Sequence, residues 1–482
     1  MIKNERQYRV TKTQLRAFQE SLEKVESMEA PPDVEPELLT ATQAAFSAQQ
    51  EELQADVEEY EALQRGEVSR FIAESLSDLP RILIKARIAL GLTQRDLAAR
   101  LDAKEQQVQR WEAMDYENAS IETLKQVIEA LGVETRGELF VPNERLTPKV
   151  FLRNLVSAGI PKDFLLNRLL PSNVAPLFEE GNALQVGLRE ILSAASAVSR
   201  VFGTQIGDLV SIEPPRLAFA GIAATRFKLP ARAKVATLDA YTIYAHYLAA
   251  LVESCADPVP IKALPNDWHT IHKALTRPGE PMTLASTLRY LWDHNVVVLP
   301  LRDEGAFHGA VWKIRGRFVI IVKQKTALEA RWLFDLLHEA GHAASGHVTD
   351  DTALIEVQPI SPGARGNEEE EANEWAEDAL FDGDSSLLED ACVQACGGRL
   401  QRLSRIIPDV AKRSNVNAGA LANHMAFRLA ADAKQWWGAA HNLQAEGTDP
   451  FATVREVLLE RVTLRRLNPL DRDLLMRALT ED

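Results

Sequence analysis

One pentapeptide, His338-Glu339-Ala340-Gly341-His342, constrains the fold more than any other part of this chain. Side chains four residues apart lie one above the other on a helix, so both imidazoles can reach one metal ion at about 2.0 Å. The mostly apolar run 332–337 before it predicts a buried helix. Glu339 would project from the adjoining face and act there as a general base. We therefore predict a Zn2+ site; the alternative is two unrelated surface histidines around a solvated glutamate.

A catalytic zinc ion needs a third protein ligand, while one coordination position stays open for water. The acidic segment 367–376 can supply it, because the apolar residues within and after it repeat at helical spacing. Glu368 and Glu369 lie at the edges of the apolar stripe, so either could point inward, and Glu371 lies further round. The alternative is a solvated acidic helix start, which the positive end of the helix dipole favours.

Arg331-Trp332-Leu333-Phe334 before the HEAGH motif and Glu-x-Glu-Ala-Asn-x-x-Ala at 369–376 resemble the ImmA/IrrE metallopeptidases. The resemblance spans residues 285–430, with Trp375 where the family usually has Phe. Members of the family are zinc-dependent cytoplasmic proteases that cleave repressors of the XRE type. The resemblance implies that Glu369 is the third zinc ligand, with Glu371 in reserve. It also implies peptide hydrolysis in which Glu339 moves the proton. The sequence does not identify the group that stabilises the tetrahedral oxyanion. His347, five residues after His342, is one candidate.

A second pattern covers residues 80–132. Thr93 is a natural N-cap for a helix that runs to Leu101, and a short turn leads into a further helix over 104–112. Apolar residues at helical spacing then predict another helix, which ends at Gly132. This order of elements is typical of a helix-turn-helix fold.

The pattern resembles the XRE family of repressors. In that family the residue at Gln94 starts the second helix near the DNA phosphates, and exposed residues of the next helix face the major groove: Gln106, Gln107, Gln109 and Arg110. Glutamine can pair with adenine and arginine with guanine. The resemblance therefore implies binding of double-stranded DNA.

The charge of the chain bears on this prediction. A net charge of −15 is not typical of nucleic-acid-binding proteins and favours a bundle that binds protein instead. Between Arg81 and Glu112, however, seven basic residues stand against four acidic ones. This local excess allows a modest phosphate-binding surface.

Length and composition predict several domains in 482 residues, and no apolar run is long enough to span a membrane. Only three cysteines occur, which fits a reducing cytoplasm. We expect five segments: a helical hairpin or coiled-coil arm, the helix-turn-helix domain, a helical middle region, the zinc peptidase domain and a helical tail, at 1–75, 76–140, 141–284, 285–430 and 431–482. The arm could form a homodimer, or its acidic stretch 51–61 could repel or mimic DNA.

The fold class expected is mainly α, with an α+β zincin-like domain whose small sheet packs against the HEAGH helix. Strands are predicted at 296–299, 310–314 and 318–322, the last two joined by a hairpin turn. The function expected is a zinc endopeptidase joined to a DNA-binding module, which regulates transcription by cleaving an XRE-type repressor or itself in a stress or mobile-element response. The alternative is a non-proteolytic regulator or antitoxin whose peptidase-like domain senses or binds a partner.

Overall fold

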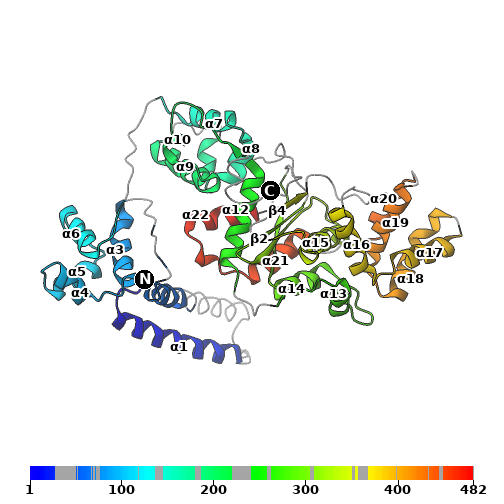
Figure 1. Ribbon diagram of the computed structural model, residues 1–482, viewed down its shortest axis with the longest axis horizontal. Coiled ribbons are helices and arrows are strands. Elements are labelled where there is room, and N and C mark those ends of the chain that lie inside the picture. Colours follow the sequence, from blue (N-terminus) through cyan, green and yellow to red (C-terminus); the bar gives the residue numbers. More distant parts are fainter. Residues whose placement is uncertain are drawn as a thin grey trace, which may run out of the picture. The chain divides into compact units, whose positions relative to one another are not determined.

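The chain forms two compact units, Met1–Leu139 and Phe140–Asp482. The computed structural model (Figure 1) describes residues 1–27, 50, 53–66, 68, 71, 76–117, 119–135, 145–179, 186–219, 240–257, 262–303, 309–349, 353–356, 367–397, 399–431, 434–444 and 449–480. Among the helices in these ranges, none has both the length and the apolar character needed to cross a lipid bilayer.

The first unit is helical in its described residues. A helix over 53–64 lies in it together with five labelled helices: α1 (Glu5–Ser27), α3 (Leu79–Ala89), α4 (Gln94–Arg100), α5 (Glu105–Ala113) and α6 (Ile121–Leu131). The connection between the two helices of the predicted hairpin lies outside the described residues. A single apolar core joins α1, the helix over 53–64 and α3 to α6.

Local sequence explains where the helices of this unit begin and end. The Thr93 hydroxyl accepts from the Asp96 N–H, and the Asp96 side chain accepts from the Thr93 N–H. This capping box fixes the start of α4. Helix α6 ends at Gly132, whose φ of 69° is a left-handed conformation that favours glycine. The three helices predicted for the helix-turn-helix pattern are therefore present close to their predicted bounds.

The second unit is mainly helical around a small sheet. Its helices before the sheet are α7 (Pro148–Ser157), α8 (Lys162–Phe164), α9 (Leu188–Phe202), α10 (Ile206–Leu209), α12 (Ala240–Cys255), α13 (Trp268–Leu275) and α14 (Leu284–Asp293). The later ones are α15 (Glu329–Ala344), α16 (Asn367–Phe381), α17 (Ser385–Cys396), α18 (Leu403–Ser414), α19 (Ala418–Ala431), α20 (Trp437–Asn442), α21 (Pro450–Glu460) and α22 (Pro469–Ala478).

Among the described residues, the sheet has four strands in the order β1-β3-β2-β4: β1 (Val296–Leu301), β2 (Gly309–Ile314), β3 (Arg317–Lys323) and β4 (Ala353–Glu356). Strands β2 and β3 form the predicted hairpin, in which Arg315 and Gly316 have φ of 50° and 80°. Positive φ at both central residues gives the twist that a two-residue hairpin needs. Strand β1 pairs with β3 in parallel. Strand β4, which pairs with β2, was not predicted. Helices α12 and α15 both pack against the sheet.

One apolar core runs through the second unit from Leu146 to Leu479. Long-range polar contacts tie its ends together. Arg477 Nη2 donates to the carbonyl of Leu166 at 2.7 Å, and Arg168 Nε pairs with Asp303 Oδ1 at 2.5 Å. The predicted middle region, peptidase domain and tail therefore share one core, and the boundaries at 284/285 and 430/431 stay predictions.

Candidate metal centre and helix-turn-helix unit

The HEAGH motif lies on α15, in the interior of the second unit. His338 and His342 are fully buried, and Glu339 is 1% exposed. Apolar residues of the same helix hold it in place; Trp332, also fully buried, donates its indole N–H to the carbonyl of Thr326 at 2.7 Å. A helix that buries imidazoles and a carboxylate must satisfy their polar atoms.

Two imidazole nitrogens and one carboxylate converge at this point. His338 Nε2 lies 3.1 Å from His342 Nε2, and the Glu369 oxygens lie 3.5 Å and 3.7 Å from these two nitrogens. The three ligand atoms are all within 4.8 Å of one another. Two nitrogens that bind one tetrahedral zinc ion are about 3.3 Å apart, given a bond length of about 2.0 Å. The donor set and its spacing therefore fit such an ion.

A close helix contact brings Glu369 to the histidines. A Cβ atom at Gly341 would lie 3.2 Å from the Ala372 carbonyl oxygen and 3.4 Å from its Cα. The missing side chain thus lets the backbones of α15 and α16 approach, and Ala372 is fully buried between them. The sequence contained this signal, a glycine inside the motif, but we had not predicted its role.

Neighbouring side chains hold both histidine rings by their other nitrogen. His338 Nδ1 is hydrogen-bonded to Asn373 Oδ1 at 3.1 Å, and His342 Nδ1 to His347 Nδ1 at 2.9 Å. His347 Nε2 in turn meets Glu371 Oε2 at 3.2 Å. Such contacts fix which ring nitrogen faces a metal. The role of Asn373 was not predicted.

These contacts separate the glutamates that the sequence left as alternatives. Glu369 lies against His338 and His342, whereas Glu371 is paired with His347 and Glu368 is exposed. His347 lies against Nδ1 of His342, the ring nitrogen remote from Glu369 and His338. His347 therefore contacts the candidate ligand His342, and this contact suits a residue that orients the ligand better than one that stabilises an oxyanion.

The protonation states expected here suit metal binding. Burial lowers the pKa of His342 below its ordinary value. Burial by itself raises the pKa of Glu369, but hydrogen bonds from His338 and His342 outweigh it and lower that pKa well below its usual range. A neutral imidazole at His342 and an ionised carboxylate at Glu369 are the forms in which these two side chains bind zinc.

Glu339 lies on the β2 side of α15. A Cβ atom at Gly309, the first residue of β2, would be 2.0 Å from Glu339 Oε1. The carboxylate therefore occupies the space that a side chain at position 309 would fill. This use of Gly309 was not predicted, because the two residues are 30 positions apart in the sequence.

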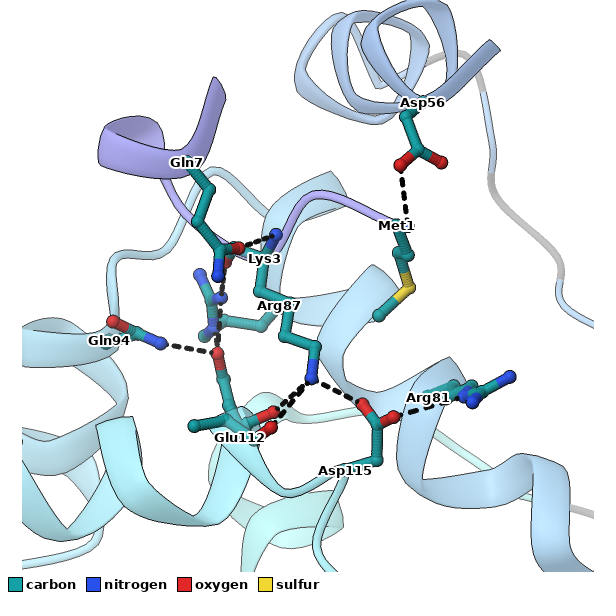
Figure 2. Close-up of polar contacts among 10 residues, drawn as sticks. Met1, Lys3, Gln7, Asp56, Arg81, Arg87, Gln94, Glu112 and Asp115 are labelled. Carbon is teal, nitrogen blue, oxygen red and sulfur yellow. Dashed lines mark hydrogen bonds and ion pairs between the residues drawn. The ribbon is translucent and has the colours of Figure 1, made fainter. Parts of the chain in front are cut away.

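The first unit holds a second polar cluster, in which Glu112 of α5 is fully buried (Figure 2). Arg87 Nε and Nη2 donate to its two carboxylate oxygens at 2.6 Å and 2.7 Å. Gln94 Nε2 donates to Glu112 Oε2 at 2.8 Å. The pair thus joins α3 and α5, and Gln94 attaches the start of α4 to them.

Four of the five predicted DNA contacts lie on exposed parts of α5. These four side chains, Gln106, Gln107, Gln109 and Arg110, are all exposed. Gln109 also donates a hydrogen bond from Nε2 to Glu105 Oε1 at 2.9 Å. Gln94 is half-buried and bound to Glu112, yet it stays at the beginning of α4, where a phosphate contact was predicted. All five side chains belong to the predicted helix-turn-helix elements.

Comparison with known families agrees with this geometry. The helix-turn-helix family model matches residues 83–137. Neither the curated proteins nor the solved structures returned a match to this chain. Residues 83–137 are therefore a helix-turn-helix domain, the DNA-binding module of a transcription regulator.

Proposed function

We propose that this protein is a zinc-dependent endopeptidase joined to a DNA-binding module. The observation that carries the proposal is the convergence of His338, His342 and Glu369, with Glu339 buried on the adjoining face of α15. Two imidazoles and one carboxylate are a ligand set of catalytic zinc sites, which keep a further position open. The likeness to ImmA/IrrE motifs supports the same assignment. The substrate proposed is an XRE-type repressor, or this chain itself.

Each residue has a defined task in the proposed reaction. His338, His342 and Glu369 would hold the ion, which when bound supplies Lewis-acid polarisation and lowers the pKa of water to about 7. Glu339 takes a proton from the attacking water and returns it to the leaving amine. Asn373 and His347 orient the two imidazoles through their Nδ1 atoms.

The proposed setting is the cytoplasm. All three cysteines are buried free thiols. Burial raises the pKa of Cys255 and of Cys392 to about 11, which keeps these thiols protonated and unreactive. They fit packing residues in a reducing compartment.

The test separates metal binding from hydrolysis. Purified full-length protein is loaded with zinc, and metal content is measured by mass spectrometry for wild type, Glu339→Gln and His342→Ala. A peptide library from a bacterial proteome then reports cleavage. We expect stoichiometric zinc in wild type and Glu339→Gln, strongly reduced zinc in His342→Ala, and cleavage by wild type alone. Equal cleavage by Glu339→Gln would refute the proteolytic assignment.

The second candidate is a non-proteolytic transcription regulator or antitoxin whose second unit senses or binds a partner. The family match favours it, because the match covers part of the DNA-binding unit alone. So does the low exposure of Glu339, 1%, since a general base must meet its substrate. If the wild type binds stoichiometric zinc but cleaves no peptide of the library, this second candidate is the correct one.

A further inference from the structure

Hydrogen bonds and an ion pair attach Lys3, near the start of the chain, to the helix-turn-helix domain (Figure 2). Lys3 Nζ donates to the carbonyls of Glu112 at 2.7 Å and Ala113 at 3.1 Å, and pairs with Asp115 Oδ1 at 2.8 Å. Arg87 Nη2 donates to the Lys3 carbonyl at 2.6 Å. A cation at the C-terminal end of α5 is favoured by the helix dipole. The start of α1 is therefore held beside the helix predicted to read DNA.

Between α1 and the helix-turn-helix domain lies a cavity of about 550 Å³. Its lining includes the segment 3–7 and, from the helix-turn-helix domain, Gln94, Arg95 and Gln109. Two of these, Gln94 and Gln109, are residues predicted to contact DNA. The cavity thus adjoins the surface at which DNA is expected.

The lining of the cavity contains more basic than acidic side chains. Four are basic (Lys3, Arg6, Arg87 and Arg95) and two are acidic (Glu5 and Glu105). Lys3 and Arg87 are engaged by Asp115 and Glu112. Arg6 and Arg95 are exposed and form no ion pair with another residue in the described ranges. Two guanidiniums, one on α1 and one on α4, are thus available at the cavity.

We propose that Arg6 and Arg95, which both line this cavity, bind phosphates of double-stranded DNA, so that α1 extends the DNA-binding surface of the helix-turn-helix domain. The proposal rests on DNA binding by that domain. Guanidinium groups suit phosphate because they donate two parallel hydrogen bonds. In a chain with net charge −15, such a local pair of cations is where phosphate contact is favoured.

The experiment measures how salt affects binding of the full-length protein to a fluorescein-labelled 30-base-pair duplex of random sequence. Fluorescence anisotropy gives the affinity at several KCl concentrations for wild type, Arg6→Gln and Arg95→Gln. Each lost phosphate contact lowers the slope of log affinity against log salt by about 0.9, and weakens binding about eightfold at 0.1 M salt. We expect this loss in both variants. The matched control is Arg16→Gln, an exposed arginine of the same helix about 15 Å further along and outside the cavity lining. It should bind as wild type does.

Each other outcome overturns the proposal in a distinct way. If Arg95→Gln weakens binding while Arg6→Gln does not, the helix-turn-helix domain binds DNA without α1. If Arg6→Gln binds more tightly, α1 opposes DNA binding instead of adding to it. If wild type binds no duplex even at low salt, both this proposal and DNA binding itself fail. Unchanged circular dichroism shows that the variants are folded.

Discussion

At the scale of single residues, two glycines leave the space that the candidate metal centre requires. Gly341 allows α16 to touch α15, which brings Glu369 to the histidines, and Gly309 leaves room for the Glu339 carboxylate. Neither position needs an unusual backbone angle. Their requirement is space, and it follows from which strands and helices are neighbours.

Gly309→Ala should therefore impair hydrolysis without removing the metal. The added methyl would lie 2.0 Å from Glu339 Oε1 and 2.9 Å from its Cδ, so the carboxylate must move. We expect peptide cleavage to fall about 100-fold, the cost of a displacement of about 1 Å at a catalytic group, while zinc content is unchanged. Gly438→Ala is the matched control, because no heavy atom lies within 4 Å of its added Cβ. Wild-type cleavage by Gly309→Ala would show that Glu339 does not act from this position.

His347→Ala should weaken zinc binding. The substitution removes the hydrogen bond of 2.9 Å to His342 Nδ1, and loss of such an orienting partner costs about 10-fold to 100-fold in metal affinity. Competition with a chromogenic chelator measures the affinity. His347→Gln, which keeps a hydrogen-bonding group, should recover part of it, and His269→Ala, a half-exposed histidine on α13, should have no effect. Equal affinity in His347→Ala and wild type would contradict the assigned role.

At the scale of elements, the helices and strands that could be predicted from the sequence are those marked by local signals. The capping box at Thr93 and the left-handed Gly132 delimit the helix-turn-helix helices, and runs of β-branched residues mark β1 and β3. Strand β4 was missed because it has four residues and exists through its pairing with β2. Likewise, the spacing in HEAGH paired the histidines, but the choice among Glu368, Glu369 and Glu371 depends on how α16 meets α15.

The pair of Arg87 and Glu112 should dominate the stability of the helix-turn-helix helices. Arg87→Met leaves a fully buried carboxylate without its main partner, which costs about 3–5 kcal/mol. Amide hydrogen exchange of residues 83–131 measures the loss. The double variant Arg87→Met/Glu112→Leu should recover most of it, because apolar side chains of similar volume replace the pair. A double variant as unstable as the single one would show that another contact of Arg87, such as that with Lys3, carries the stability.

At the scale of the whole molecule, the described residues form two apolar cores, one for each compact unit. The candidate metal ligands all lie in the second unit, and the helix-turn-helix domain lies in the first. Units with separate cores can fold separately.

We expect the fragment 140–482 to bind zinc with the affinity of the full chain, and the fragment 1–139 to bind duplex DNA. Isothermal titration of each fragment and anisotropy with the labelled duplex measure these affinities. A much weaker zinc affinity in 140–482 would mean that the first unit helps to build the metal centre. A fragment 1–139 that binds no DNA, beside a full chain that does, would assign part of the DNA surface to the second unit.

The contact between Arg477 and Leu166 affects the order in which the two units can fold during synthesis on the ribosome. These residues are 311 positions apart, so translation must continue long after Leu166 has emerged before the second core can close. The first unit, Met1–Leu139, has its own apolar core and can therefore fold well before that. Protease digestion of stalled nascent chains should find residues 83–131 protected at lengths where 329–344 are still cleaved. A chain that folds in this order could bind DNA through its helix-turn-helix domain before the candidate metal centre of its second unit has formed.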